Sequence, residues 1–332
     1  MMHRAWLSVV LLTALRTPLC AQESAVWRDP SPHKVQFVTV EENVRLEVLD
    51  WGGSGRPIIF LSGLGGTAHL FDEFAPKLAN AYHVYGITRR GFGASSIPAS
   101  GYEADRLGDD VLSVLDSLKL NAPVLVGESL GGEELSSVGS RFPGRVAGLV
   151  YLDAGYQYAF ENGKGTTLEE LQKIAPPQPP EPSAIDSAGF AAYQAWFKRI
   201  NGIAFPEAEF RQMMESAPNG SVGKTRTPPS VPMAILAGMR KYTDIRAPVL
   251  AIYAVPHDLG PWLNDNKDPA MRTAAEAFSA NDVAWTEKQA KAFEDGVPSA
   301  RVIRLPRANH VVFLSNEADV LREMRAFLAA LK

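Results

Sequence analysis

The residue with the clearest potential for chemistry is Ser129, at the centre of Gly-Glu-Ser-Leu-Gly, residues 127–131. An apolar, β-branched run at 124–126 precedes it and predicts a buried strand, and a segment of helical character follows at 133–142. A serine on a tight strand-to-helix turn has a strained backbone, and the flanking glycines leave room for neighbouring elements. The helix N-terminus also favours developing negative charge. The pattern predicts a nucleophile rather than a chance match in a loop.

The segments around Ser129 predict the framework that must position it. Strands are expected where residues are continuously apolar or alternate, at 35–39, 44–48, 57–61, 83–87, 124–126, 146–152, 248–253 and 301–305. Helical spacing recurs between and after them, at 70–78, 105–118, 133–142, 269–278, 282–293 and 317–331. This alternation is typical of an α/β protein.

The serine motif, in its context of strand, turn and helix, resembles the nucleophile elbow of the α/β-hydrolase fold superfamily. The glycine-rich loop Ser-Gly-Leu-Gly-Gly-Thr at 62–67 is also similar to that family, as is the turn at 88–95, where Thr88 replaces the usual acid. The resemblance covers roughly residues 33–332. It implies a mostly parallel central sheet of about eight strands flanked by helices, with a helical cap inserted after the sixth strand.

The resemblance also implies partners for the serine, which needs a general base within hydrogen-bonding reach. The family's order along the chain, serine then acid then histidine, assigns the base to His310 in the loop after the last strand. The acid most often follows the penultimate strand, which favours Asp258. Some members carry it one strand earlier, which makes Asp153 the alternative. His257 is interpreted as a loop residue rather than a base.

Two backbone N–H groups are expected to stabilise an oxyanion. By position in the family these belong to Leu64, in the glycine-rich loop, and Leu130, which follows the nucleophile. That loop usually begins with His-Gly, whereas this chain has Ser62-Gly63. A purely structural glycine turn is the other interpretation.

The rhythm of strands stops after the sixth predicted strand. Residues 156–243 have interrupted helical character, with helices expected at 168–174, 189–200, 207–215 and 233–239. The family places its cap here, so we expect a core domain at 33–155 and 244–332 and a helical cap or lid at 156–243. Aromatic and methionine side chains of the cap either line an apolar substrate pocket or pack against the core, and packing is favoured residue by residue.

Composition narrows the function. The chain has 332 residues, 46% hydrophobic and 21% charged, with a net charge of −4, and its basic residues form no long run. Nucleic acid is therefore not an expected partner. No histidine and acid cluster has metal-ligand spacing, and no dinucleotide or phosphate-binding fingerprint occurs. We expect neither a metal nor a cofactor, and a small-molecule substrate as the partner.

The first 21 residues are laid out as a secretory signal peptide: Arg4, an apolar run at 5–15, and Ala21 before polar residues. The run is too short to span a membrane, and no other stretch approaches that length. A secreted or periplasmic protein cleaved after Ala21 is expected. A lipid anchor on Cys20, the sole cysteine, and an uncleaved extension are the alternatives.

The sequence thus predicts a serine hydrolase that transfers acyl groups through Ser129, His310 and Asp258. The expected substrate is a carboxylic ester of small or medium size and apolar character. Other possibilities are an aminopeptidase or amidase similar to proline iminopeptidases, a lactonase, a C–C hydrolase, a cofactor-free haloperoxidase-like enzyme, and a non-catalytic receptor. A serine nucleophile argues against the fold's epoxide hydrolases and haloalkane dehalogenases, which use aspartate. The sequence determines neither the substrate nor the oligomeric state.

Overall fold

The computed structural model describes residues 27–167, 169–170 and 176–332. Contacts within the chain separate Met1–Pro30 from Ser31–Lys332, and the second unit contains every element described below. The predicted signal peptide at 1–21 and most of the predicted helix at 168–174 lie outside the described residues.

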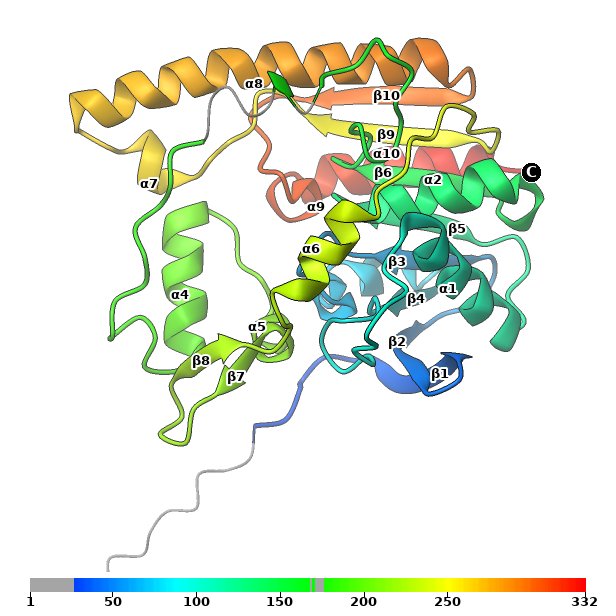
Figure 1. Cartoon of the computed structure of the whole chain (residues 1–332), viewed down its shortest axis with the longest axis horizontal. Helices are drawn as coiled ribbons and strands as arrows, with labels where there is room; N and C mark the ends of the chain where they lie inside the picture. Colours follow the sequence, from blue (N-terminus) through cyan, green and yellow to red (C-terminus); the bar gives the residue numbers. More distant parts are fainter. Residues whose placement is uncertain (1–26, 168, 171–175) are drawn as a thin grey trace, which may run out of the picture. The chain divides into compact units, whose positions relative to one another are not determined.

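An eight-stranded sheet forms the centre of this unit, in the order β1-β2-β4-β3-β5-β6-β9-β10 (Figure 1). Its strands are β1 (Lys34–Glu41), β2 (Val44–Gly52), β3 (Pro57–Leu61), β4 (His83–Ile87), β5 (Val124–Glu128), β6 (Gly148–Leu152), β9 (Val249–Ala254) and β10 (Ala300–Leu305). β2 is antiparallel to β1 and β4, and all other neighbours are parallel. The predicted strands and the mostly parallel sheet are confirmed.

Both faces of the central parallel strands β5, β6 and β9 are buried, whereas the edge strand β10 is partly exposed. Leu125 of β5 belongs to a core shared with α1 (Ala104–Ser117), α2 (Gly131–Arg141) and the end of α8 (Pro269–Gly296). Its neighbours Val124 and Val126 face the opposite core. That core includes the 3-10 helices η1 (Ala68–Phe71) and η2 (Ala75–Leu78) and the C-terminal helix α10 (Glu317–Ala330). Burial on both faces explains why these strands are continuously apolar in sequence.

Three short helices complete the framework: η3 (Pro143–Arg145), α7 (Pro261–Asn264) and α9 (Val312–Ser315). None of the helices in the described residues has the length and hydropathy needed to cross a membrane.

The segment between β6 and β9, residues 153–248, is called the insertion below. It contains α4 (Phe190–Asn201), α5 (Glu207–Met213), α6 (Ser230–Ala237) and an antiparallel hairpin of β7 (Met214–Ser216) and β8 (Val222–Thr225). The hairpin was not predicted, because strands of three or four residues carry too little pattern. Aromatic rings pack α4 against α5, with Phe197 and Phe210 at 5.3 Å between centroids. A separate cap domain at 156–243 stays a prediction.

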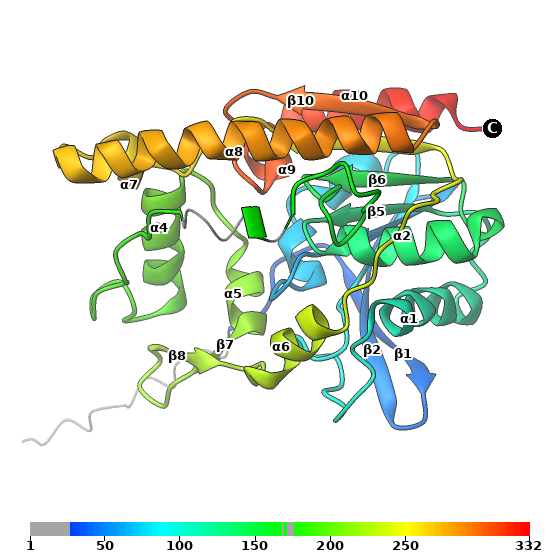
Figure 2. The ribbon, with the colours of Figure 1, turned by 45° about the horizontal axis from the view of Figure 1, so that its top comes forward.

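Two helix predictions were wrong in form. The expected helix at 70–78 is two 3-10 turns, since Pro76 has no N–H to continue an α-helix. The expected pair at 269–278 and 282–293 is one helix of 28 residues, α8. No glycine or proline interrupts it there, and the Asn281 side chain donates to the Ala277 carbonyl oxygen of the same helix at 2.8 Å. Figure 2 shows α8 running along β10 and onward past the sheet.

Candidate active site

Ser129 occupies a sharp turn between β5 and α2. Its φ of +48° lies in the left-handed region, which is uncommon for a residue with a side chain. The turn is closely packed: a Cβ at Gly127 would lie 2.7 Å from the Gly131 backbone, and one at Gly131 would lie 2.6 Å from the Leu61 carbonyl oxygen. Only glycine fits at either position. The strand, turn and helix predicted around Ser129 are present.

His310, in the loop after β10, contacts Asp153. Its Nδ1 lies 2.5 Å from Asp153 Oδ2. The Asp153 side chain follows β6 directly and has no exposed surface, whereas the His310 side chain is 45% exposed. The other oxygen of Asp153 accepts hydrogen bonds from the Ala254 N–H and the Tyr156 hydroxyl, both at 2.9 Å. These two hydrogen bonds, one from β9 and one from the insertion, hold Asp153 in place independently of its contact with His310.

Asp258, the acid preferred from sequence, makes different contacts. Its Oδ1 accepts hydrogen bonds from the Gly260 N–H at 2.9 Å and from the Asn264 side chain at 2.8 Å, within the turn that begins α7. No contact joins it to the His310 ring within the described residues. β6 and β9 are neighbours and end at the same sheet edge, so an acid after either could face His310. The chain has already turned away by residue 258.

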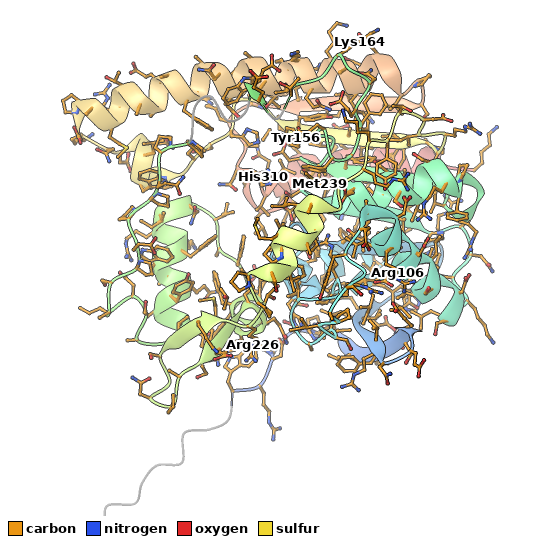
Figure 3. All side chains as sticks on the ribbon, viewed as in Figure 1. Arg106, Tyr156, Lys164, Arg226, Met239 and His310 are labelled. Atoms are coloured by element: carbon orange, nitrogen blue, oxygen red, sulfur yellow. The ribbon has the colours of Figure 1, made fainter. Side chains whose placement is uncertain are left out.

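Ser129 and His310 border the same cavity, of about 280 Å³. Figure 3 shows His310 and Tyr156, both of which line it, near each other. The remaining walls come from the insertion, α8 and the loop after β9: Gln157, Tyr158, Thr166, His257, Asp282, Trp285 and Thr286. The structure thus brings the predicted serine and histidine to one cavity, with Asp153 behind the histidine.

The glycine-rich loop at 62–67 lies directly against the serine. A Cβ at Gly63 would lie 2.8 Å from Ser129 Cβ, so only glycine allows this approach. Gly63 N–H donates to Glu128 Oε2 at 2.7 Å. The N–H groups of Leu64 and Leu130 donate to no protein acceptor within the described part of the chain. Both predicted donors therefore retain unused hydrogen-bonding capacity.

Arg89 holds this loop through two backbone carbonyl groups. Its guanidinium donates to the carbonyl oxygens of Ser62 at 2.7 Å and Gly63 at 3.0 Å. The same group binds both oxygens of Glu134 at 2.7 Å, and both side chains are buried. The pairing of Arg89 with Glu134 was not predicted from sequence, because it depends on how α2 lies relative to the turn after β4.

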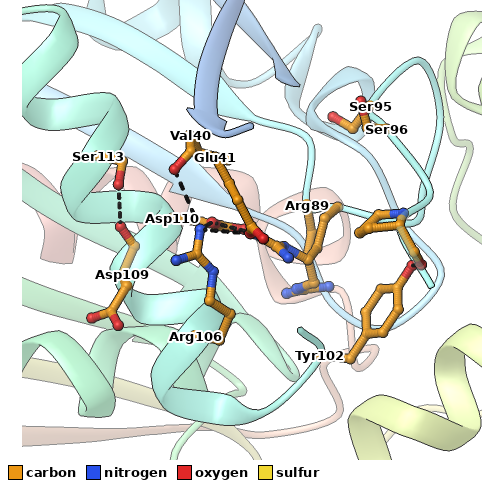
Figure 4. Close-up of polar contacts among 12 residues, drawn as sticks. Val40, Glu41, Arg89, Ser95, Ser96, Tyr102, Arg106, Asp109, Asp110 and Ser113 are labelled. Carbon is orange, nitrogen blue, oxygen red and sulfur yellow. Dashed lines mark hydrogen bonds and ion pairs between the residues drawn. The ribbon is translucent and has the colours of Figure 1, made fainter. Parts of the chain in front are cut away.

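The next residue, Arg90, anchors the same turn to α1. Its Nε and Nη2 bind the two carboxylate oxygens of Asp110 at 2.6 and 2.7 Å. Arg106 adds a further bond to Asp110 at 2.7 Å, and this network reaches Glu41 (Figure 4). Such bidentate pairs are geometrically specific, so they fix the path of the turn.

Acidic groups surround His310 on both sides of its ring. Glu128 is buried, and its Oε1 lies 3.8 Å from His310 Nε2. Desolvation would lower the pKa of His310, but the Asp153 hydrogen bond and the charges of Asp153 and Glu128 outweigh it and raise that pKa. Burial raises the pKa of Glu128. These surroundings therefore stabilise the protonated, positively charged form of His310.

A second histidine contacts Asp153. His257 Nε2 lies 2.6 Å from the same oxygen, Oδ2, that His310 contacts. Ligand atoms of Asp153, His257 and His310 lie within 4.8 Å of one another, a spacing that could hold a metal ion, but the two short separations are hydrogen-bond lengths. Elsewhere, Asp72 contacts His33 at 2.7 Å and His69 at 3.2 Å in a similar way. Asp153 lies more than 100 residues from both histidines, so the sequence shows no metal-like spacing for this group.

The sequence comparison decides the family. Residues 58–323 match the profile of the Alpha/beta hydrolase family. The chain belongs to the alpha/beta hydrolase family. The order of its sheet and the turn at Ser129 accord with that membership.

Curated relatives of this alpha/beta hydrolase match it over part of their length. It is 33% identical to AB hydrolase superfamily protein YisY of Bacillus subtilis over 153 residues, 43% of this chain and 57% of that protein. It is 29% identical to 2-(acetamidomethylene)succinate hydrolase of Mesorhizobium japonicum over 101 residues, 30% of this chain and 36% of that one. Non-heme chloroperoxidase of Streptomyces lividans is 33% identical over 120 residues, 35% and 44% of the two chains. Each match spans less than two thirds of the relative.

Solved structures resemble it over more of the chain. E-2-(acetamidomethylene)succinate hydrolase has a TM-score of 0.64 at 19% identity, covering 90% of this chain and 100% of that chain. Carboxylesterase CesB of Bacillus subtilis has a TM-score of 0.56 at 15% identity, covering 90% and 92%. At these identities the similarity supports the fold alone. The reaction of this alpha/beta hydrolase has to be inferred from its own site.

Proposed function

We propose that this alpha/beta hydrolase is a serine hydrolase that transfers an acyl group to water. Ser129 is the nucleophile, His310 the general base, and Asp153 the acid that orients it. The observation that carries the proposal is the 2.5 Å contact between His310 Nδ1 and the buried Asp153, on a histidine that shares a cavity with Ser129. This contact places the proton on Nδ1 and leaves Nε2 to accept another.

The proposed reaction has two acyl-transfer steps. As Ser129 Oγ attacks the substrate carbonyl carbon, His310 Nε2 takes the hydroxyl proton, and the Leu64 and Leu130 N–H groups stabilise the oxyanion. His310 then protonates the leaving alcohol, and an acyl-enzyme remains. In the second step His310 takes a proton from water, which attacks the acyl carbon. As the bond to Ser129 Oγ breaks and the acid is released, His310 returns this proton to Ser129 Oγ.

Asp153 serves both steps by staying ionised. Burial alone would raise its pKa, but the charges and hydrogen bonds of His257 and His310 outweigh burial and hold that pKa well below the usual value. The carboxylate therefore stabilises the imidazolium without taking its proton.

We favour a carboxylic ester with a short acyl group as the substrate. A cavity of about 280 Å³ is small for a ligand site. Its walls combine aromatic rings of Tyr156, Tyr158 and Trp285 with polar groups such as Gln157 and Thr286. Within the small or medium apolar substrates expected from sequence, this mixture favours a small ester that also carries polar groups. A non-catalytic receptor would have no need of a serine on a strained turn beside a histidine and acid pair.

The direct test compares the wild-type protein with Ser129→Ala on aryl esters of increasing acyl length. We expect turnover that is greatest for short acyl groups, and a fall in kcat of roughly 10⁴–10⁶ in the variant, because it lacks the hydroxyl that forms the acyl-enzyme. Ser113→Ala is the matched control, since that hydroxyl only bonds to the Asp109 carbonyl of its own helix.

Equal turnover by the wild-type protein and Ser129→Ala would contradict the nucleophile assignment. Aminoacyl arylamides and lactones belong in the same panel. Serine-dependent cleavage of one of these, with the esters left intact, would replace the ester with that bond.

A further inference from the structure

The proposed reaction assigns no proton-transfer step to His257, although the contacts of this residue are as close as those of the base. It lies in the loop after β9, and its side chain is 13% exposed. Nε2 lies 2.6 Å from Asp153 Oδ2, and Nδ1 lies 2.8 Å from Asp282 Oδ1. Both acceptors are carboxylates, so both ring nitrogens must donate. Only the doubly protonated, cationic imidazole has two donors.

Asp282 of α8 holds this imidazole in place. One of its oxygens accepts a hydrogen bond from Nδ1–H, and the other accepts one from the backbone N–H of His257 at 2.9 Å. The Asp282 side chain is 10% exposed, so solvent competes little for these bonds. Asp282 thus binds both the backbone and the side chain of His257. These two contacts fix the direction of the Nε2–H bond of His257.

Asp153 is fully occupied by four donors. Oδ2 accepts hydrogen bonds from His257 and His310, while Oδ1 accepts them from Tyr156 and the Ala254 N–H. The charge of Asp153 is therefore shared between two imidazoles. If His257 were neutral or absent, the full field of the carboxylate would act on His310 alone.

The groups that face His257 come from each element around it: Asp153 after β6, Tyr156 of the insertion, Asp282 of α8 and His310 after β10. The Tyr156 hydroxyl lies 3.3 Å from Nε2, and burial raises the pKa of that phenol well above its usual value, so it stays neutral. The His310 ring lies 5.9 Å away, centroid to centroid. Burial would lower the pKa of His257, but the two carboxylates outweigh it and raise it to about 10.

We propose that His257 is a positioning residue, a permanent cation that Asp282 holds against Asp153 to fix this acid and to moderate its pull on His310. This inference rests on the proposed function, in which Asp153 orients the base. Moderation matters because a general base must be deprotonated at the working pH. Two acids, Asp153 and Glu128, favour protonated His310, and the nearby His257 cation opposes them.

The first test is the pH profile of kcat/KM for the ester cleaved by the wild-type enzyme. In His257→Gln, which keeps a donor toward Asp153 but removes the charge, we expect the acidic midpoint to move up by roughly 1 pH unit. Asp282→Asn should move it in the same direction. Asp295→Asn, on the same helix but exposed and paired with Lys291, should leave it unchanged.

A second readout does not need activity. In the full-length Ser129→Ala protein, NMR titration of the histidine rings should show His257 protonated through neutral pH. Adding Asp282→Asn should raise the titration midpoint of His310. This measurement decides the role of His257 even if no ester is cleaved, and it covers the case in which His257→Gln fails to fold.

The inference is overturned if the acidic midpoint and the His310 titration both stay at their wild-type values in the variants, even with a lower kcat. It is also overturned if His257 titrates near the ordinary histidine pKa of about 6.5. Either outcome would make the contact with Asp282 a structural one. Absence of Ser129-dependent turnover, by contrast, would count against the proposed function and not against the His257 charge.

Discussion

At the scale of the single residue, Asp153 is notable because its side chain has no exposed surface. All of the hydrogen bonds that it accepts are therefore made away from solvent. Its φ of +47° lies, like that of Ser129, in the left-handed region. Ser129 and Asp153 therefore both have a strained backbone, and they directly follow the adjacent strands β5 and β6. This strain indicates that the contacts of the side chains set the local backbone conformation.

Asparagine substitution of the two candidate acids tests this residue directly. In Asp153→Asn we expect kcat for ester hydrolysis to fall by roughly 10⁴, since the amide neither carries the charge nor enforces the tautomer of His310. Asp258→Asn is the matched control and should stay within a few-fold of wild type, because its remaining carbonyl oxygen can still accept from Gly260 and Asn264. Steady-state kinetics at one pH above neutrality measure both. The reverse ranking would restore Asp258 as the acid.

At the scale of elements, a buried acid links the insertion to the glycine-rich loop. Glu209 of α5 has no exposed surface, and its oxygens accept hydrogen bonds from the Thr67 N–H at 2.9 Å and from the Thr67 hydroxyl. Thr67 ends the loop that carries Leu64. The position of α5 and the path of the loop are therefore coupled through one carboxyl group.

This link makes stability depend on pH. Burial raises the pKa of Glu209 from 4.5 to about 7, so between these values the folded protein holds a proton that the unfolded chain releases. The free energy of unfolding therefore falls as pH rises through this window, and Glu209 contributes about 3 kcal/mol to that fall. In Glu209→Gln this part of the pH dependence should vanish. The free energy of unfolding of the variant should therefore increase relative to that of the wild type between pH 5 and pH 7.5. Urea unfolding at both pH values measures this difference.

Glu207→Gln on the same helix provides the control. Glu207 is partly exposed and paired with Arg211 one turn on, so its substitution should leave the slope unchanged. A Glu209→Gln variant whose difference from wild type is the same at both pH values would show that the buried acid does not change its protonation on unfolding.

For the whole molecule, the secretory signal at residues 1–21 stays a prediction. If the segment directs export, mass spectrometry of the protein recovered outside the cytoplasm should find Gln22 as the first residue. Substituting Ala21 with a bulky residue such as tryptophan should block this cleavage, because the processing site requires a small side chain. Retention of Met1 in the exported or total protein would contradict the prediction, and lipid attached to Cys20 would favour the anchored alternative.

The sequence alone determined the central sheet and the turn at Ser129. Apolar runs mark β3, β5 and β9 because a strand buried on both faces can carry few polar residues, and this constraint is local. The glycines around Ser129 are equally local signals, since the backbone there admits no Cβ. His310 also followed from its place in the order of elements, and it does border the cavity of Ser129.

Only the tertiary structure decided which acid meets His310 and what else surrounds it. Asp153 and Asp258 follow neighbouring parallel strands, so both reach the same sheet edge, and only the paths of the two loops distinguish them. The hydrogen bond between Asp282 and His257 joins residues 25 positions apart, and the ion pair of Arg89 with Glu134 joins residues 45 positions apart. Such contacts depend on how separate elements pack, and neither local propensity nor hydrophobic periodicity along the chain encodes that packing.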